Sequence, residues 1–276
     1  MNQVSLVNVS KRFGKKQALQ DVSCQINSGI TALLGPNGAG KSTLMNIICT
    51  LLKADSGTVY YNGQDIHKNK QDFLARLSIQ FQNQPMYRND TAMEYLHFCG
   101  ALKDLSALQV DEEGQHLLRQ FGLADTGKKK IAAFSGGMRQ RLALCGTFLG
   151  SPEIILLDEP TAGLDIYERE ALKRYLHELK QDRIIIVSTH IVSDVENIAD
   201  NIILLNEGQI RAVGSQTELI RGLENRVWEI PADVNVPNAY YSDGRQLLIA
   251  EKCPAADAKQ KEPDLTDVYF SVVRGG

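Results

Sequence analysis

One stretch decides the fold of this chain of 276 residues: Gly35-Pro36-Asn37-Gly38-Ala39-Gly40-Lys41-Ser42-Thr43. It follows the apolar run 30–34, which has the length of a buried strand. It precedes apolar residues at helical spacing, namely Leu44, Ile47, Ile48 and Leu51. The order strand, glycine loop, helix is the context that a G-x4-G-K-[ST] motif needs in order to bind phosphate. The motif therefore predicts a phosphate-binding loop, or P-loop.

The chemistry of this loop follows from its residue types. Glycines allow successive backbone N–H groups to point at one anion, and the next helix directs the positive end of its dipole to the same place. Lys41 adds a full charge for the terminal phosphates, and the Ser42 hydroxyl is placed to hold Mg²⁺. The alternative is a flexible loop that contains three glycines by chance. We assign the following residues to the nucleotide site: Gly35, Asn37, Gly38, Gly40, Lys41, Ser42 and Thr43.

Composition excludes several classes of function. The hydrophobic share of 43%, the charged share of 23% and the net charge of −3 are ordinary for a globular protein and give no strong field toward nucleic acid. The run Lys128-Lys129-Lys130 is too short for duplex binding, so we expect no nucleic-acid partner. The five cysteines have no C-x-x-C spacing, which favours a reducing compartment. No apolar run approaches the roughly 20 residues that span a bilayer.

Three continuous apolar runs organise the centre of the chain. The run 30–34 ends at the P-loop, the run 154–157 ends at Asp158-Glu159-Pro160, and the run 184–187 ends at Ser188-Thr189-His190. Short apolar runs between helical segments are typical of parallel strands that are covered on both faces. Ligands of open α/β sheets bind beyond the carboxyl ends of the strands. The three runs are therefore predicted to bring their polar residues to the edge where the P-loop lies.

The remaining segments predict an antiparallel β layer before the core and a helical insertion within it. Strands are expected at 3–9 and 22–26, with a turn at 11–14 and a hairpin at 57–66 around Asn62-Gly63. The segment from about 85 to 150 has a helical texture. A further helix is expected after His190, because Ile191, Val195 and Ile198 share one face.

The tail differs from the core. A hairpin at 202–213 closes the core near residue 220. Residues 221–276 predict a small β-plus-helix annex, with strands at 227–230, 240–241 and 247–249 and a polar linker at 254–263. Asp264 can cap a final helix whose apolar residues are Leu265, Val268, Tyr269 and Val272.

Taken together, residues 3 to 220 resemble the ATP-binding cassette (ABC) ATPases. The loop at 35–43 resembles the family's Walker A motif, Gln82 its Q-loop, and the stretch 134–141 (Phe-Ser-Gly-Gly-Met-Arg-Gln-Arg) its signature. Residues 155–159 are similar to Walker B with the catalytic glutamate, 162–165 to the D-loop, and His190 to the switch histidine. The resemblance implies an α/β fold: a P-loop NTPase core with a parallel sheet, an antiparallel β subdomain and an inserted α-helical subdomain at about 85–150. Residues 1–220 would form this nucleotide-binding domain, and 221–276 a small α+β C-terminal accessory domain.

The resemblance also implies roles for single residues. Glu159 would orient the attacking water, with His190 and Gln82 as its catalytic partners, and Ser42, Asp158 and Gln82 would hold the metal. Phe13 stands where the family places an aromatic ring under adenine. Each role has a plainer alternative: Asp158 and Glu159 as a helix cap, His190 as a buried core histidine, Phe13 as a packing residue. Gln80 and Gln84 compete with Gln82 for the Q-loop role.

The signature residues Ser135, Gly136 and Gly137 begin a helix and form a second anion site. The resemblance implies that two cassettes pair head to tail, so that each signature completes the partner's ATP site. The implied cofactors are ATP and Mg²⁺, and the implied partner is a second nucleotide-binding subunit, in the simplest case a copy of this chain.

The resemblance further implies a separately encoded transmembrane permease and a cytoplasmic position on the inner face of the cell membrane. The signature departs from its commonest form at Phe134 and Met138, a variant similar to exporters of drugs, lantibiotics or polysaccharides. The alternatives are an importer subunit, a soluble cassette that remodels ribosomes or nucleic acid, and a P-loop kinase or GTPase. The importer is the nearest of these, although importers often carry a larger C-terminal domain.

Overall fold

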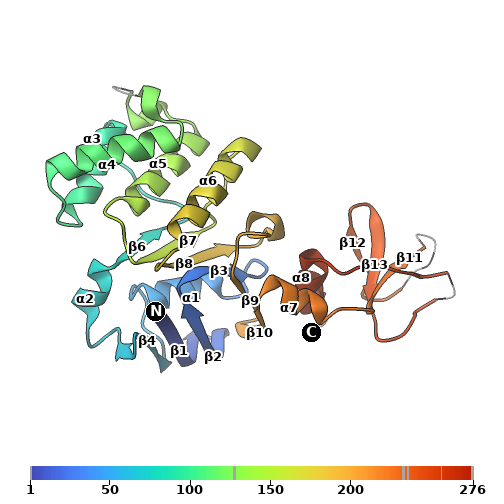
Figure 1. The fold of residues 1–276 in the computed structure, drawn as a ribbon. Coiled ribbons are helices and arrows are strands. Elements are labelled where there is room, and N and C mark those ends of the chain that lie inside the picture. The colour runs from blue at the N-terminus through green and yellow to red at the C-terminus, as the bar shows by residue number, and fades with distance from the viewer. Residues whose placement is uncertain (1, 127–128, 232–233, 235, 256, 275–276) are drawn as a thin grey trace.

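The computed structural model describes residues 2–126, 129–231, 234, 236–255 and 257–274. Lys128, part of the basic run, lies outside the described residues. The chain folds around a six-stranded sheet, with helices on one side and an antiparallel sheet on the other (Figure 1). The predicted α/β fold with a P-loop NTPase arrangement is confirmed.

The six-stranded sheet has the order β10-β9-β3-β8-β7-β6. All neighbours are parallel except β9 and β10, which form the predicted hairpin. The three apolar runs form parallel strands, as predicted, and the structure places them side by side. The paired positions Leu34 with Thr189 and Asp158 with Ser188 bring their carboxyl ends to one edge. The strands are β3 (Gly29–Leu34), β6 (Leu77–Gln80), β7 (Ile154–Asp158), β8 (Ile184–Thr189), β9 (Asn201–Asn206) and β10 (Gln209–Gly214).

Alternate residues of these buried strands serve two separate cores. Ile155 and Leu157 of β7 face the helical side, whereas Ile154 and Leu156 face the antiparallel sheet. This division follows from the two-residue period of a strand and explains why the runs are apolar throughout. The sheet is thus covered on both faces, and its polar residues can gather only at its ends.

The antiparallel sheet has the order β2-β1-β4-β5, and α1 (Lys41–Ile48) packs between it and the parallel sheet. The turn predicted at 11–14 is wrong for Lys11 to Phe13, which pair with β2. The backbone turns later, at Gly14, where φ is +57°. Leu51 lies beyond the end of α1 and is exposed. The strands are β1 (Gln3–Phe13), β2 (Lys16–Asn27), β4 (Ser56–Tyr61) and β5 (Gln64–Asp65).

The segment 85–150 is helical, as expected. Thr91 and Ser106 close reciprocal capping boxes at the starts of α3 and α4, which fixes where these helices begin. The buried faces of α3, α4 and α5 join the core of the parallel sheet. Besides α1, the helical elements before β8 are α2 (Lys70–Ala75), α3 (Ala92–Ala101), α4 (Ala107–Gln120), η1 (Ala124–Thr126), η2 (Ile131–Ala133), α5 (Gly136–Phe148) and α6 (Ile166–Leu179).

The helix expected after His190 is wrong. Only a single 3₁₀ turn, η3 (Val192–Asp194), forms there. Two observations account for this. The Asp194 carboxylate is buried and accepts hydrogen bonds from Thr161 and Arg169, which fixes the segment to neighbouring elements, and Asn197 takes a left-handed φ of +65° that ends any helix.

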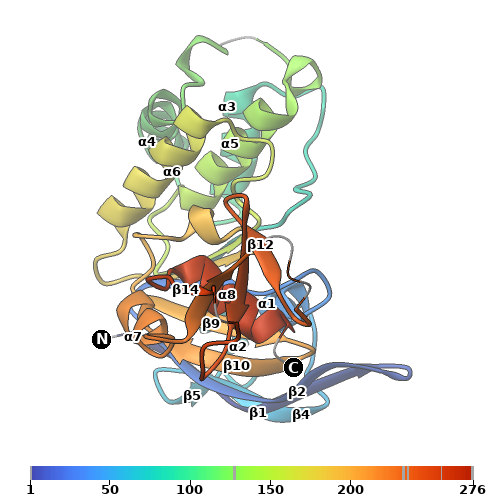
Figure 2. The same ribbon diagram turned by 90° about the vertical axis from the view of Figure 1, so that its right-hand side faces the viewer.

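The C-terminal segment forms a four-stranded sheet of order β12-β13-β11-β14 and two helices (Figure 2). The linker expected at 254–263 contains a short strand, β14, that pairs with Trp228 and Glu229. α8 leaves this sheet and packs against β9 and η3, with Leu265 and Val268 buried in the main core. The elements are α7 (Gln216–Arg221), β11 (Val227–Ile230), β12 (Tyr240–Ser242), β13 (Arg245–Ile249), β14 (Lys259–Gln260) and α8 (Leu265–Arg274).

Candidate functional site

The glycine loop between β3 and α1 curls around the side chain of Lys41. The Lys41 ammonium is buried and donates hydrogen bonds to the carbonyls of Gly35 (2.6 Å) and Pro36 (3.2 Å). Gly40 has φ +110°, and a Cβ there would lie 2.5 Å from the carbonyl oxygen of Ala18. Only glycine fits this position, because both the backbone angle and the space exclude a side chain. The loop is thus closed around a cation and opens toward the carboxyl edge of the sheet.

The charge of Lys41 is set by two opposing effects. Burial lowers the pKa of Lys41, and the carboxylates of Glu159 and Asp158 act against that shift by raising it. The Lys41 ammonium therefore lies near two negative charges in a site that is largely shielded from solvent. Phosphate oxygens are a natural further partner for such a cation, because burial strengthens charge-assisted hydrogen bonds.

Asp158 ends β7 beside the first turn of α1. Its Oδ2 accepts a hydrogen bond from the Ser42 hydroxyl at 3.2 Å. Its Oδ1 is buried and has no hydrogen-bond partner within the described part of the chain. A buried carboxylate oxygen is costly when it is unpaired, whereas hard cations such as Mg²⁺ prefer oxygen ligands. Ser42 and Asp158 therefore fit a magnesium ion, held directly or through its water shell.

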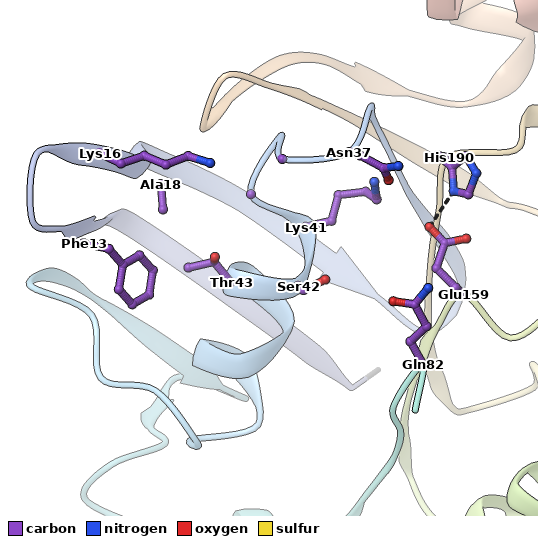
Figure 3. Close-up of a pocket in the computed structure, with 12 residues that line it drawn as sticks. Phe13, Lys16, Ala18, Asn37, Lys41, Ser42, Thr43, Gln82, Glu159 and His190 are labelled. Carbon is purple, nitrogen blue, oxygen red and sulfur yellow. Dashed lines mark hydrogen bonds and ion pairs between the residues drawn. The ribbon is translucent and has the colours of Figure 1, made fainter. Parts of the chain in front are cut away.

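Glu159 lies at the same edge and is fixed from several sides. Its backbone has φ +49°, a conformation that non-glycine residues rarely adopt, and its amide donates to the carbonyl of Ser188 (2.8 Å). Its carboxylate accepts from the hydroxyl of Thr189 at 3.2 Å and lies 2.8 Å from Nδ1 of His190 (Figure 3). The strained turn at the end of β7 directs the carboxylate into the cavity and holds it there.

A cavity of about 260 Å³ joins the P-loop to Glu159 and His190 (Figure 3). The P-loop and α1 form one wall, and Gln82 and Glu159 lie opposite. Phe13 stands at the far end and is half exposed, which leaves its ring accessible to a base. The predicted residues that line the cavity are Phe13, Asn37, Gly38, Gly40, Lys41, Ser42, Thr43, Gln82, Glu159 and His190. Gln82, rather than Gln80 or Gln84, reaches this cavity: Gln80 is fully buried, and Gln84 accepts from the Phe81 amide.

The signature residues lie outside this cavity. Ser135 caps α5 by accepting from the Met138 amide at 3.1 Å. A Cβ on Gly137 would lie 2.8 Å from the carbonyl of Gly163, so this glycine is needed for packing within the chain. A Cβ on Gly136 would meet no described atom within 4 Å. Within one chain, the P-loop, Asp158, Glu159 and His190 therefore lie together, whereas the signature residues Ser135 and Gly136, here called the signature tip, lie apart from them.

Sequence reasoning missed several residues that support the site. Lys16 lines the cavity from the start of β2. Gln140, which is buried in α5, donates to the carbonyl of Pro160 at 2.9 Å and so joins the signature helix to the acidic pair. Thr161 donates to buried Asp194. Gln140 lies within the signature stretch 134–141, which was the one available signal; Asp194 and Lys16 lack any recognisable spacing.

The family model described as "ABC transporter" matches residues 19–162. This chain belongs to the ABC transporter family. ABC ATPase domains bind ATP and hydrolyse it to drive transport, and such subunits generally pair with transmembrane permease components. Across the described residues, no helix has both the length and the apolar character that crossing a membrane requires.

Relatives of this ABC ATPase include proteins of more than one kind. It is 32% identical over 214 residues to the ABC transporter ATP-binding protein NatA of Bacillus subtilis, and this alignment covers 75% of this chain and 87% of NatA. It is 32% identical over 218 residues to the daunorubicin resistance ATP-binding protein DrrA3 of Streptomyces coeruleorubidus, covering 78% and 69%. It is 36% identical over 220 residues to the probable sulfate/thiosulfate import ATP-binding protein CysA of Chlorella vulgaris, covering 78% and 92%.

A solved structure of the ATP-binding subunit of an ABC transporter superposes with a TM-score of 0.74 at 27% identity, covering 80% of this chain and 93% of that chain. The same part of the chain is therefore matched by sequence and by shape. The relatives' names include both resistance and import, so family membership alone leaves the direction of transport open.

Proposed function

We propose that this ABC ATPase powers export through a separately encoded permease, from the cytoplasmic face of the cell membrane. Residues 1–220 act as the nucleotide-binding domain and 221–276 as an accessory domain. The observation that carries the ATPase site is the meeting of Lys41, Glu159 and His190 in one cavity, with Asp158 bound beside it to Ser42. Import is the second candidate, supported by the identity to CysA. Export is favoured by the relative named for daunorubicin resistance and by Phe134 and Met138 in the signature.

In this proposal the residues of the cavity divide the chemistry among them. The P-loop amides and Lys41 bind the phosphates, and the Phe13 ring stacks on the adenine. Glu159 orients the attacking water and draws its proton, because its carboxylate is held toward the cavity by Thr189 and His190. Ser42, Asp158 and Gln82 would hold Mg²⁺, which would neutralise charge on the phosphate oxygens.

A head-to-tail dimer of cassettes follows from what one chain leaves incomplete. The tip formed by Ser135 and Gly136 presents N–H groups at the start of α5 but lies outside the chain's own cavity. Ile166 and Tyr167 are 78% and 87% exposed at the start of α6, next to the D-loop. An exposed apolar pair beside an unused anion site supports burial against a second cassette, whose phosphates the tip would contact.

The permease would dock on the helical side of the molecule. A groove of about 460 Å³ lies between α2, β6, α3 and the end of α5. Leu102 lines it and is 72% exposed, and Leu74 adds a second exposed apolar residue. We propose that a short helix of the permease occupies this groove.

The partner and the direction are tested by isolating the complex. Tagged Glu159→Gln protein, held with ATP, is purified from solubilised membranes of the native cell, and its partners are identified by mass spectrometry. A permease without a solute-binding protein is the expected result. Recovery of a permease that retains a solute-binding protein would establish import instead. A Leu102→Asp variant serves as control, since it should lose the permease while it still binds ATP.

A further inference from the structure

The turn between β9 and β10 packs directly against the backbone of the P-loop. The amide of Gly208 donates to the carbonyl of Ala39 at 2.9 Å. A Cβ on Gly35 would lie 2.1 Å from the carbonyl oxygen of Leu205, so the two backbones are in direct contact. Glu207 and Gly208 have φ +49° and +75°, which makes the turn tight. The turn and the P-loop are therefore packed as one unit, and a shift of the turn displaces the loop.

The same turn is joined to the C-terminal helix. Asn206, the last residue of β9, is 9% exposed, and its side-chain amide donates to the carbonyl of Val272 at 3.0 Å. Val272 lies in the last turn of α8, where carbonyls have no partner within the helix. Asn206 thus provides a hydrogen-bond donor to a helix end that needs one. It stands two residues from Gly208, which contacts the P-loop.

α8 is in turn fixed to the C-terminal sheet. Asp267 is fully buried and accepts a hydrogen bond from the Tyr240 hydroxyl at 2.7 Å, and the Lys261 ammonium lies 2.6 Å from its other oxygen. Tyr240 belongs to β12 and stacks on Phe270 of α8. Breaking one partner of such a buried network is costly. The annex sheet and α8 therefore move together.

The opposite side of α8 packs into the main core, against β9 and the turn η3 that follows His190. Leu265 and Val268 are buried in the core that also holds Val195 and Leu204. Burial, and to a smaller extent the charge of Glu159, raises the pKa of Tyr269. α8 thus contacts both the annex and the segment that follows His190.

We propose that Asn206 is a positioning residue that couples the annex, through α8, to the P-loop. In the state with the Asn206 hydrogen bond intact, the turn holds the P-loop in its binding geometry. Loosening α8 weakens the binding of ATP without any change in a residue that contacts it. This inference rests on the proposed assignment of the P-loop to ATP. It makes the accessory segment a means of regulating nucleotide affinity.

The test compares Asn206→Ala and Asn206→Asp with Gln209→Ala in the full chain. Gln209 pairs with Asn206 through the backbone, so its variant perturbs the same turn but leaves the link to α8. The dissociation constant for ATP is measured by calorimetry, at a temperature where unfolding curves show each variant to be folded. Asn206→Ala and Asn206→Asp should weaken binding about fivefold or more, and Gln209→Ala should not.

A second measurement uses the reciprocity of coupling. If α8 affects ATP binding, ATP must affect α8. Amide exchange in residues 265–274 should become slower on ATP addition in the unmodified chain and in Gln209→Ala, but not in Asn206→Ala. A purely structural role would lower the stability of Asn206→Ala and leave both its ATP affinity and this ATP-dependent protection intact.

The outcomes distinguish failure of the proposed ATP site from failure of the proposed coupling through Asn206. Lys41→Ala should abolish ATP binding, and wild-type binding by that variant would refute the proposed site itself. Loss of binding in Lys41→Ala together with unchanged affinity in both Asn206 variants would overturn the coupling alone. Unchanged exchange of α8 in the unmodified chain would overturn it as well.

Discussion

Gly136 and Gly137 are neighbours with different reasons for being glycine. Gly137 packs against the carbonyl of Gly163, so a methyl group there would force the backbone to move. Gly136 has open space around it in the described structure. No atom in the described part of the chain therefore explains Gly136, whereas the approach of a partner's phosphates would explain it.

Gly136→Ala should leave the free energy of unfolding unchanged or raise it by up to about 0.5 kcal/mol, because alanine is the better helix former. It should nevertheless reduce ATP hydrolysis strongly, since the partner's nucleotide could no longer approach the tip. Urea unfolding and phosphate release measure the two effects. Gly137→Ala is the matched control and should lower stability. Normal hydrolysis by Gly136→Ala would contradict the assignment of the tip.

At the scale of elements, α5 runs from the signature to the groove proposed for the permease, and Lys103 caps the C-terminal end of α5. The Lys103 ammonium donates to the carbonyls of Gly146 (3.0 Å), Thr147 (3.1 Å) and Leu149 (2.6 Å). A cation at the C-terminus of a helix is favoured by the helix dipole. Burial nevertheless lowers the pKa of Lys103 to about 8, with the charges of Cys99 and Glu113 acting in the opposite direction.

This pKa makes the stability of the fold depend on pH in the alkaline range. The unfolded lysine, with a pKa near 10.4, binds more protons than the folded one between pH 8 and about 10.4. The unfolding free energy therefore rises with pH across that window, by up to roughly 1.4 kcal/mol per unit. Urea unfolding at pH 7 and pH 9.5 should show this gain relative to Lys103→Met. The exposed Lys68→Met variant should behave like the unmodified chain.

The elements that could be predicted from sequence are those fixed by local pattern. The strands β3, β7 and β8 are continuous apolar runs, and Asp264 marked the start of α8. The missed elements depend on distant contacts. The helix expected after His190 had the right apolar spacing, but the buried bonds of Asp194 override it. β14 forms only because Trp228 offers an edge on which Gln260 pairs.

The same distinction holds for the site. The P-loop could be predicted because glycine and lysine spacing is itself the chemistry of phosphate binding. Gln140 and Asn206 could not, because their importance comes from a carbonyl that lies far away in sequence or in another element. A buried amide has no signature until the fold shows its partner.

At the scale of the whole molecule, we propose that two copies form one working unit. In this proposal each chain supplies the P-loop for one nucleotide and the signature residues for another, so ATP joins the copies and hydrolysis separates them. The C-terminal annex joins the rest of the chain through α8, which packs against β9, next to the β9–β10 turn that contacts the P-loop (Figures 1 and 2).

The central claim is tested most directly by the molecular mass of Glu159→Gln in solution, measured by light scattering after gel filtration, with and without ATP and Mg²⁺. The substitution should stop hydrolysis while Lys41 and the P-loop still hold the nucleotide. The account predicts a monomer without ATP and a dimer with it, and no dimer when Lys41→Ala or Gly136→Ala is added. A Glu159→Gln protein that binds ATP and stays monomeric, or that hydrolyses ATP at the normal rate, would contradict the account.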